Sequence, residues 1–257
     1  MTGFELYASA LVPMAGLVLL GWFISLARNN VDVVDSLWSL MFLVAAGAYF
    51  HFGPEQNERG HLMVWLVLIW ALRLSIYLTV RNWGHAEDRR YQAIRARNEP
   101  NFRTKALWRV FGIQALLAWI ISIPLFGAVG GEAPLGWLDY AGVALFTLGF
   151  IFEAGGDWQL SRFLKNPANA GKVMDQGLWR YTRHPNYFGD FCIWWGFYLL
   201  ALGAGAWWTF YGPLLMTGLL LKVSGVALLE KDIGERRPAY ADYIRRTNAF
   251  LPGPPRD

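Results

Sequence analysis

The residues best suited to chemistry gather in one short stretch, Gly177–Phe191, with the sequence GLWRYTRHPNYFGDF. Its cations, Arg180, Arg183 and His184, are side chains that bind phosphate well, and arginine does so through two parallel hydrogen bonds. Pro185 presets the backbone for a helix start, where free N–H groups and the helix dipole favour anions. The stretch is therefore predicted to bind an anionic molecule.

The same stretch carries aromatic and polar side chains. Tyr181 and Tyr187 can stack on a planar ring, and Asp190, one turn beyond Asn186, can accept hydrogen bonds from ribose hydroxyls or a carboxamide. A positive, aromatic membrane anchor would explain the arginines and tyrosines, but not an Asn-Tyr pair followed by an acid. We therefore favour a dinucleotide or nucleoside site. The chain has no GxGxxG or P-loop pattern, so such a site would not be of the Rossmann type.

Charged side chains also occur inside apolar segments, where they are costly and usually functional. Asp32 and Asp35 open the second apolar segment, and Arg73 lies within the third. Glu153 and Asp157 end the fifth, four residues apart and so on one helix face. A pairing of Arg73 with Asp35 that only fixes helix packing is the alternative to a chemical role.

The elements that must position these residues are membrane helices. The chain has 257 residues, is 55% hydrophobic and contains 14 Trp, and about 20 apolar residues suffice to cross a bilayer. We expect an all-α polytopic membrane protein, one integral membrane domain over 1–257. Seven transmembrane helices are predicted, over 8–27, 36–52, 62–80, 110–128, 137–160, 186–204 and 206–229.

The charges indicate an orientation. Of the 23 lysines and arginines, all except Arg59, Arg73 and Lys222 fall in segments that this topology places on one side, and Lys222 lies toward that same side in the seventh span. By the positive-inside rule the N-terminus is outside and the C-terminus cytoplasmic, so the Gly177–Phe191 stretch faces the cytoplasm. The loop 81–109 is expected to be a basic amphipathic segment. The tail is expected to form a short amphipathic helix ended by prolines, with membrane-surface adhesion as a compatible role.

At these residues the sequence also resembles a family. GLWRYTRHPNYFGD is similar to the C-terminal signature of membrane steroid 5α-reductase-like proteins, in particular of bacterial relatives once grouped under a domain of unknown function. The resemblance runs from about Trp70 to Pro252 and is strongest from Glu153 to Trp195. It is shared more loosely with sterol C14 and Δ7 reductases and isoprenylcysteine carboxyl methyltransferases. It implies a seven-helix enzyme that uses NADPH to reduce the Δ4 double bond of 3-oxo-steroids.

The resemblance also implies cofactor-binding residues, with some departures. Asp190 stands where the family has Glu, Lys172 where it has Arg, and Glu153 where it often has Asn. Spacing in the tail differs, so Glu230 and Tyr240 are approximate matches. The full predicted cofactor set is Asn82, Glu153, Asp157, Lys165, Lys172, Tyr181, Arg183, His184, Asn186, Tyr187, Asp190, Trp194, Glu230 and Tyr240.

The residues expected to hold the substrate's 3-oxo group are less similar to those of the family. The family holds the 3-oxo group with a Gln-Glu pair on helix 2 and a tyrosine on helix 3, and this chain has no such pair. Asp35 is the available carboxyl group, and Tyr77, or else Trp70, is the helix-3 candidate. Asp35 can donate a hydrogen bond only when protonated, which burial would favour. No metal is expected.

The predicted function is NADPH-dependent reduction of a 3-oxo-4-ene steroid or similar lipophilic enone in a membrane, expected to be the bacterial inner membrane. Its partners would be that small molecule and membrane lipids, without nucleic acid or an obligatory protein partner. One alternative is an S-adenosylmethionine-dependent membrane methyltransferase, which would need fewer cations than NADPH requires. The other is a non-catalytic sterol- or lipid-binding protein, which would have no nucleotide affinity.

Overall fold

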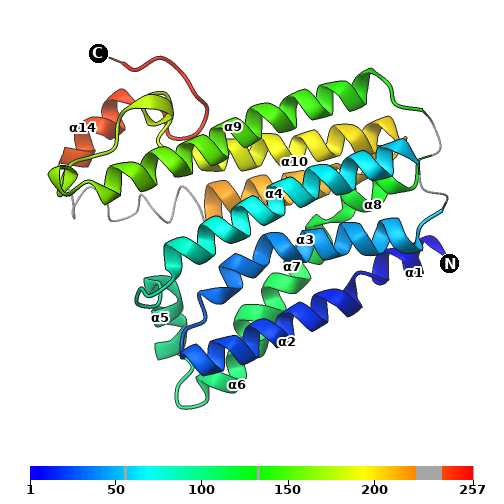
Figure 1. Cartoon of the computed structure of the whole chain (residues 1–257), viewed down its shortest axis with the longest axis horizontal. Coiled ribbons are helices and arrows are strands. Elements are labelled where there is room, and N and C mark those ends of the chain that lie inside the picture. Colours follow the sequence, from blue (N-terminus) through cyan, green and yellow to red (C-terminus); the bar gives the residue numbers. More distant parts are fainter. Residues whose placement is uncertain (55–56, 132–133, 224–238, 257) are drawn as a thin grey trace. The chain divides into compact units, whose positions relative to one another are not determined.

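The structure is a computed structural model, and it describes residues 1–54, 57–131, 134–223 and 239–256. Every regular element in these ranges is a helix, as Figure 1 shows, so the expected all-helical class is confirmed for this part of the chain. The chain forms two compact units, described separately below. The first comprises Met1–Leu135 and Leu200–Thr209, and the second comprises Gly136–Leu199 and Phe210–Asp257.

The first unit is built mainly from long apolar helices. A left-handed Asn29 (φ 49°) ends the second helix, and the Asn57 side chain caps the fourth by accepting from Gly60 N at 2.7 Å. The elements are α1 (Gly3–Ala8), α2 (Leu11–Arg28), α3 (Val33–Phe52), α4 (Glu58–Asn82), α5 (Arg89–Ala96), α6 (Phe102–Ala106), the π-helix η1 (Leu107–Gly112), α7 (Ile113–Ile121) and α8 (Ile123–Val129).

Helices α3 and α4 pack closely in this unit. The Ser39 hydroxyl donates to the carbonyl of Ala71 at 2.9 Å, and the rings of Phe42 and Trp70 lie 5.8 Å apart. These side chains are fully buried. The packing of α3 against α4 therefore holds the start of α3, where Asp35 lies, in a fixed place within the unit.

The second unit contains the motif stretch. Its elements are α9 (Trp137–Lys165), the 3-10 turns η2 (Pro167–Asn169) and η3 (Gly177–Arg180), α10 (Pro185–Gly203), α11 (Tyr211–Gly218), the π-helix η5 (Leu219–Val223) and α14 (Ala239–Arg246). The end of α10 from Leu200, and the turn η4 (Trp207–Phe210) as far as Thr209, belong to the first unit. The predicted amphipathic tail helix corresponds to α14.

Glycines spaced seven residues apart bring α9 and α10 into close contact. Gly142, Gly149 and Gly156 lie on one face of α9, and Gly189 and Gly196 lie on α10. A Cβ atom at Gly149 would lie 2.5 Å from the Gly189 carbonyl oxygen, and one at Gly196 would lie 2.8 Å from that of Gly142. Small residues allow such backbone approach in membrane helices. The two helices run side by side in Figure 1.

Five helical segments are long and apolar enough to cross a membrane, which identifies an integral membrane protein. They are Gly3–Arg28, Val33–Phe52, Glu58–Asn82, Phe102–Val129 and Trp137–Lys165, and they match the first five predicted spans. The sixth predicted span corresponds to α10, which is not among the five. The seventh begins at η4 and extends into residues outside the described ranges.

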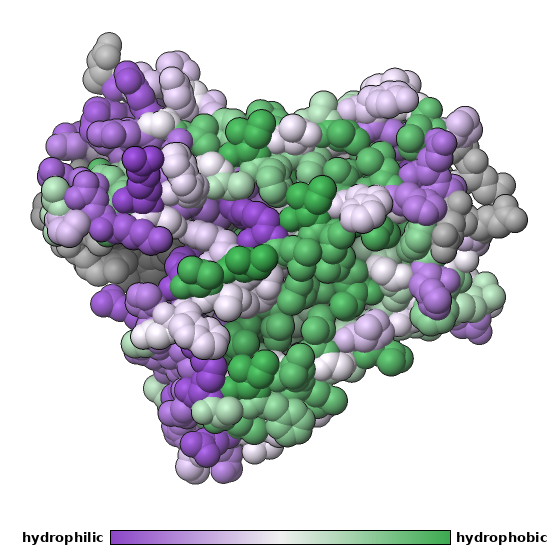
Figure 2. Space-filling model, viewed as in Figure 1, coloured by the Kyte–Doolittle hydropathy of each residue, from purple (hydrophilic) through white to green (hydrophobic). Residues whose placement is uncertain are grey.

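The surface agrees with this assignment. Figure 2 shows hydrophobic side chains over α2 and hydrophilic side chains gathered at α5 and α6. Exposed apolar side chains on α2 and α4 include Phe23, Trp65 and Ile76. Because contiguous exposed apolar surface is rare in soluble proteins, we assign these side chains to lipid contact.

Candidate functional site

A buried polar cluster forms where α9 meets the start of α10. Glu153 and Asp157 are each 3% exposed although both are acids. The Asn186 amide donates from Nδ2 to Asp157 Oδ1 at 3.2 Å, joining residues 29 positions apart. Burying such groups is costly unless they are hydrogen-bonded. The glycine contact therefore positions a carboxylate and an amide together, and their predicted role in a nucleotide site stays a prediction.

The two tyrosines predicted to stack on a planar ring, Tyr187 and Tyr181, differ in how far they are exposed. The Tyr187 ring stacks on the buried His184 ring, with centroids 5.5 Å apart and planes 10° from parallel. The backbone N–H of His184 donates to the Thr182 hydroxyl at 3.3 Å. Tyr181, in contrast, is 46% exposed. Of the two tyrosines, Tyr181 thus offers the accessible ring.

Arg183 takes part in the packing of the tail. Its guanidinium donates to the carbonyl of Ile244 at 3.1 Å and to that of Thr247, and its backbone N–H donates to Asn248 O at 2.9 Å. The side chain is buried. A cation at the end of α14 is favourable because the helix dipole leaves that end negative. The described bonds of Arg183 therefore hold α14, and its predicted phosphate contact stays a prediction.

Farther along α10, Asp190 is partly buried and Trp194 is fully buried. The Trp194 ring meets Phe197 edge to face at 5.5 Å. Asp190 and Trp194 therefore lie one and two turns beyond Asn186, on helix α10, which begins within the motif stretch.

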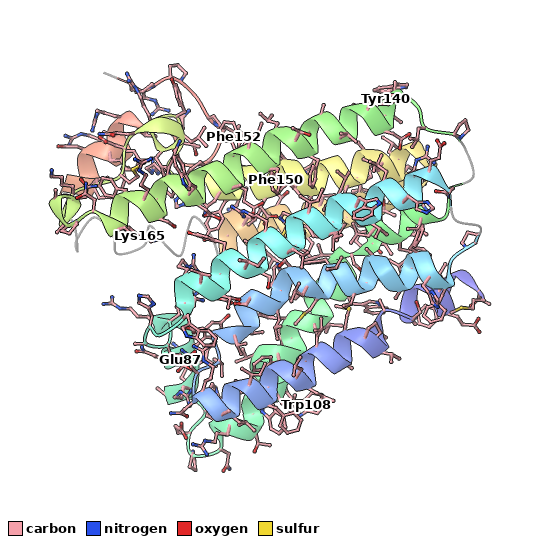
Figure 3. All side chains as sticks on the ribbon, viewed as in Figure 1. Glu87, Trp108, Tyr140, Phe150, Phe152 and Lys165 are labelled. Carbon is pink, nitrogen blue, oxygen red and sulfur yellow. The ribbon has the colours of Figure 1, made fainter. Side chains whose placement is uncertain are left out.

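The remaining cofactor candidates of this unit lie nearer the surface or in the tail. Lys165, labelled in Figure 3, ends α9 and is exposed, as is Lys172. Tyr240 is buried on α14, where its ring meets that of Tyr243 at 5.2 Å. Glu230 lies outside the described residues.

A second, partly buried cluster surrounds Asp35 in the first unit. The Tyr91 hydroxyl donates to Asp35, and Arg90 Nη2 lies 3.2 Å from the other carboxylate oxygen. The Gln114 side chain donates to the Tyr91 oxygen at 3.1 Å. The alternative pairing considered from the sequence was wrong, because the cation beside Asp35 is Arg90 and not Arg73.

This cluster depends on a set of acidic contacts that attach the loop before α5 to the turn before α3. The backbone N–H of Asp88 donates to both carboxylate oxygens of Asp32 at 3.1 Å. The Glu87 carboxylate accepts two bonds from Arg95, both at 2.8 Å, and one from Val31 N at 3.0 Å. Figure 3 shows Glu87 beside α5. Residues 87–95 are thus attached to the bundle, whereas the sequence indicated only a basic segment.

The environment of these groups sets their protonation. Burial raises the pKa of Tyr91 well above its ordinary value, and the neighbouring Asp35 carboxylate acts in the same direction. Burial opposes the ionisation of Glu87, but hydrogen bonds from Arg95 and Val31 outweigh it and lower the pKa of Glu87. At neutral pH, therefore, Tyr91 is a neutral phenol and Glu87 a charged carboxylate.

The predicted helix-3 candidates lie in different surroundings. Tyr77 lies between two cations on α4, with Arg73 at 5.5 Å and Arg81 at 5.6 Å from its ring centroid. The Asn82 side chain accepts from Arg81 Nε at 3.1 Å. The alternative Trp70 packs in the core against Phe42. The phenol in direct contact with Asp35 is therefore Tyr91, which sequence reasoning missed.

Two signals in the sequence could have indicated this cluster. Tyr91 and Ile94 are three residues apart in an otherwise charged run, which is the spacing of a helix face that packs inward. Gln114 is a lone amide in an apolar segment, where polar side chains usually have a purpose. It follows the π-helix η1, and π-helical turns are frequent at functional sites.

The fold and these two clusters define a helical integral membrane protein with buried polar sites. The chain belongs to the family described as "Protein of unknown function (DUF1295)", which matches residues 21–247. It is also similar to the uncharacterized protein C594.04c of Schizosaccharomyces pombe, with 27% identity over 263 residues, covering 90% of this chain and 75% of the yeast protein. No solved structure matches the chain.

Proposed function

We propose that this protein is an NADPH-dependent membrane reductase that saturates the conjugated double bond of a lipophilic enone, such as a 3-oxo-4-ene steroid. The observation that carries the proposal is the partly buried hydrogen bond of Asn186 on α10 to Asp157 on α9. It brings together two residues that the resemblance to the steroid 5α-reductase-like proteins assigns to the cofactor. The DUF1295 description itself assigns no activity.

The second unit would bind the cofactor, which when bound supplies the hydride for such a reaction. The residues present fit a dinucleotide, because the buried Asp157 and the partly buried Asn186 offer an acceptor and donors for ribose or carboxamide groups. Tyr181 offers an exposed ring for stacking. The exposed Lys165 and Lys172 supply positive charge for phosphates.

The first unit would bind the enone carbonyl through Tyr91. A carbonyl oxygen that gathers negative charge is stabilised by a preorganised donor, and this is often a large catalytic term. Because Arg90 pairs with Asp35, that carboxyl group is better suited to orient the phenol than to donate a proton itself. The carbonyl would compete with Asp35 for the Tyr91 proton, while the Gln114 bond holds the phenol oxygen in place.

We also infer seven transmembrane helices, with the N-terminus outside and the C-terminus in the cytoplasm, in a bacterial inner membrane. The distribution of lysines and arginines supports this orientation. Arg59, the one arginine assigned to an outer loop, is buried and donates to the Pro134 carbonyl at 3.0 Å. This internal hydrogen bond explains why an arginine lies on the outer side. In the proposed orientation the cofactor residues would face the cytoplasm.

The test is NADPH oxidation by the detergent-purified protein, with and without progesterone. Steroid-dependent oxidation that Asn186→Ala abolishes, and that the exposed-loop change Asn101→Ala leaves unchanged, would support the reductase. NADPH binding without turnover would retain the cofactor and direct the search to other enones. Absence of NADPH binding would overturn the proposal. Binding of S-adenosylmethionine instead would identify the methyltransferase alternative, and binding of sterol alone a lipid-binding protein.

A further inference from the structure

The second unit contains a polar cleft that the proposed function does not use. Its volume is about 410 Å³, within the range of sites for small molecules. Three arginines line it, together with an acid and a hydroxyl group: Arg180, Arg246, Arg256, Asp175 and Thr247. Three guanidinium groups against one carboxylate, counted over the residues that the structure describes, make the cleft electropositive.

The walls of the cleft are held by hydrogen bonds between segments distant in sequence. The buried Trp179, next to Arg180, donates from its indole to Gly156 O at 3.0 Å and accepts at its carbonyl from the Tyr243 hydroxyl. The backbone N–H of Arg256 donates to Arg246 O at 2.8 Å. The turn η3, the end of α14 and the tail are therefore fixed together, so the arginines need little reorganisation to act on one ligand.

The arginine charges are only partly neutralised. Arg246 lies 3.4 Å from the Asp175 carboxylate. Arg256 donates to the neutral amide of Asn248 at 2.8 Å. The Arg180 side chain is exposed and has no hydrogen bond or ion pair among the described residues. Two of the three guanidinium groups thus have no acidic partner in the part of the chain that the structure describes.

We propose that this cleft binds a phosphomonoester group. Guanidinium forks match the geometry of phosphate oxygens, and a doubly charged phosphate satisfies more than one arginine at once. A soluble nucleotide with a terminal phosphate and a lipid with a phosphomonoester headgroup present this same chemistry. The inference does not rest on the reductase proposal, because it uses none of the residues assigned to the cofactor or the enone.

The test is isothermal titration of the full-length protein in detergent with two probes, adenosine 2′-monophosphate and dihexanoyl phosphatidic acid. Adenosine and dihexanoyl phosphatidylcholine serve as the matched ligands without a phosphomonoester. We expect Arg180→Gln to weaken binding by about tenfold, as for a charge-assisted hydrogen bond. Arg245→Gln is the control, because Arg245 is an exposed cation on α14, next to the cleft residue Arg246, that pairs with Asp242 and does not line the cleft.

A third variant separates a site from a loss of folding. Asp175→Asn removes the one acid among the described residues that line the cleft, so it should tighten binding about threefold to fivefold. If only one probe depends on Arg180 for its affinity, that probe shows whether the natural ligand is a nucleotide or a lipid. If both probes depend on Arg180, the cleft recognises the phosphomonoester group that they share. Equal loss in Arg180→Gln and Arg245→Gln, weaker binding in Asp175→Asn, or no binding of either probe would each overturn the proposal. Arg180-dependent binding without NADPH oxidation would leave it standing while the reductase fails.

Discussion

The phenol of Tyr91 donates a hydrogen bond to the carboxylate of Asp35, although 56 residues separate the two in the chain. Tyr91 lies on the short helix α5, and Asp35 lies in the first turn of the apolar helix α3. Arg90 and Gln114 complete the group. A buried proton donor, an oriented carboxylate and a partly exposed compensating cation are therefore assembled in one place, which is a suitable arrangement for binding a carbonyl oxygen.

Tyr91→Phe should lower the rate of enone reduction by about a hundredfold, because it removes the donor to the developing oxyanion. The dissociation constant for NADPH should stay unchanged. Steady-state kinetics with progesterone, together with NADPH titration, measures both quantities. Tyr77→Phe is the matched control, and a larger loss in that variant would return the carbonyl contact to α4.

Asn186→Ala should weaken NADPH binding by about tenfold or more, because it leaves the buried Asp157 carboxylate without this donor. Asn186→Asp should be worse, since it places a second carboxylate beside Asp157. Quenching of tryptophan fluorescence on NADPH titration measures the affinities. Wild-type affinity in Asn186→Asp would show that this pair does not contact the cofactor.

Gly196→Ala should destabilise the second unit by about 1–3 kcal/mol, because its Cβ would lie 2.8 Å from the Gly142 carbonyl oxygen and 3.0 Å from Phe146 N. Gly218→Ala is the control, since no atom lies within 4 Å of its Cβ position. Thermal unfolding in detergent should therefore show a lower Tm for the first variant only. Equal Tm values would mean that α9 and α10 are farther apart than described.

Arg183→Gln should detach α14 from the motif stretch, because the guanidinium donates to two carbonyls at the end of that helix. Amide hydrogen exchange over residues 239–247 should become faster by at least tenfold. Arg183→Lys should not restore protection, since an ammonium cannot reproduce the planar fork. Arg180→Gln should leave exchange unchanged, and unaltered exchange in Arg183→Gln would contradict this structural role.

The contact of Glu87 with Arg95 should stabilise the protein only when Glu87 is ionised. The pKa of Glu87 is lower in the folded state than its ordinary value of 4.5. Its contribution is therefore fully present above pH 4.5 and is lost as the pH falls through the folded-state pKa. Glu87→Gln should lower Tm at pH 7, and the gap from wild type should close as the pH falls below 4.5 and through the lowered folded-state pKa. A gap that is constant with pH would exclude ionisation as its cause.

Several features followed from the sequence alone. Long apolar runs predicted the five helices that are able to span a membrane, because the hydrophobic requirement of a bilayer is a local property of composition. The spacing of Glu153 and Asp157 placed both acids on one helix face, and the tail pattern predicted the helix that became α14. The match of residues 21–247 to DUF1295 is also a property of the linear chain.

Other features depended on the tertiary structure. Tyr91 lies in a charged run that suggested a surface segment, and only the attachment of Glu87 and Asp88 to the turn before α3 brings its phenol to Asp35. Arg183 and Arg180 have the same side chain three positions apart, yet one holds α14 and the other lines an electropositive cleft. Residue type sets what a side chain can bind, whereas the packing of distant segments decides which partner lies within contact distance of it.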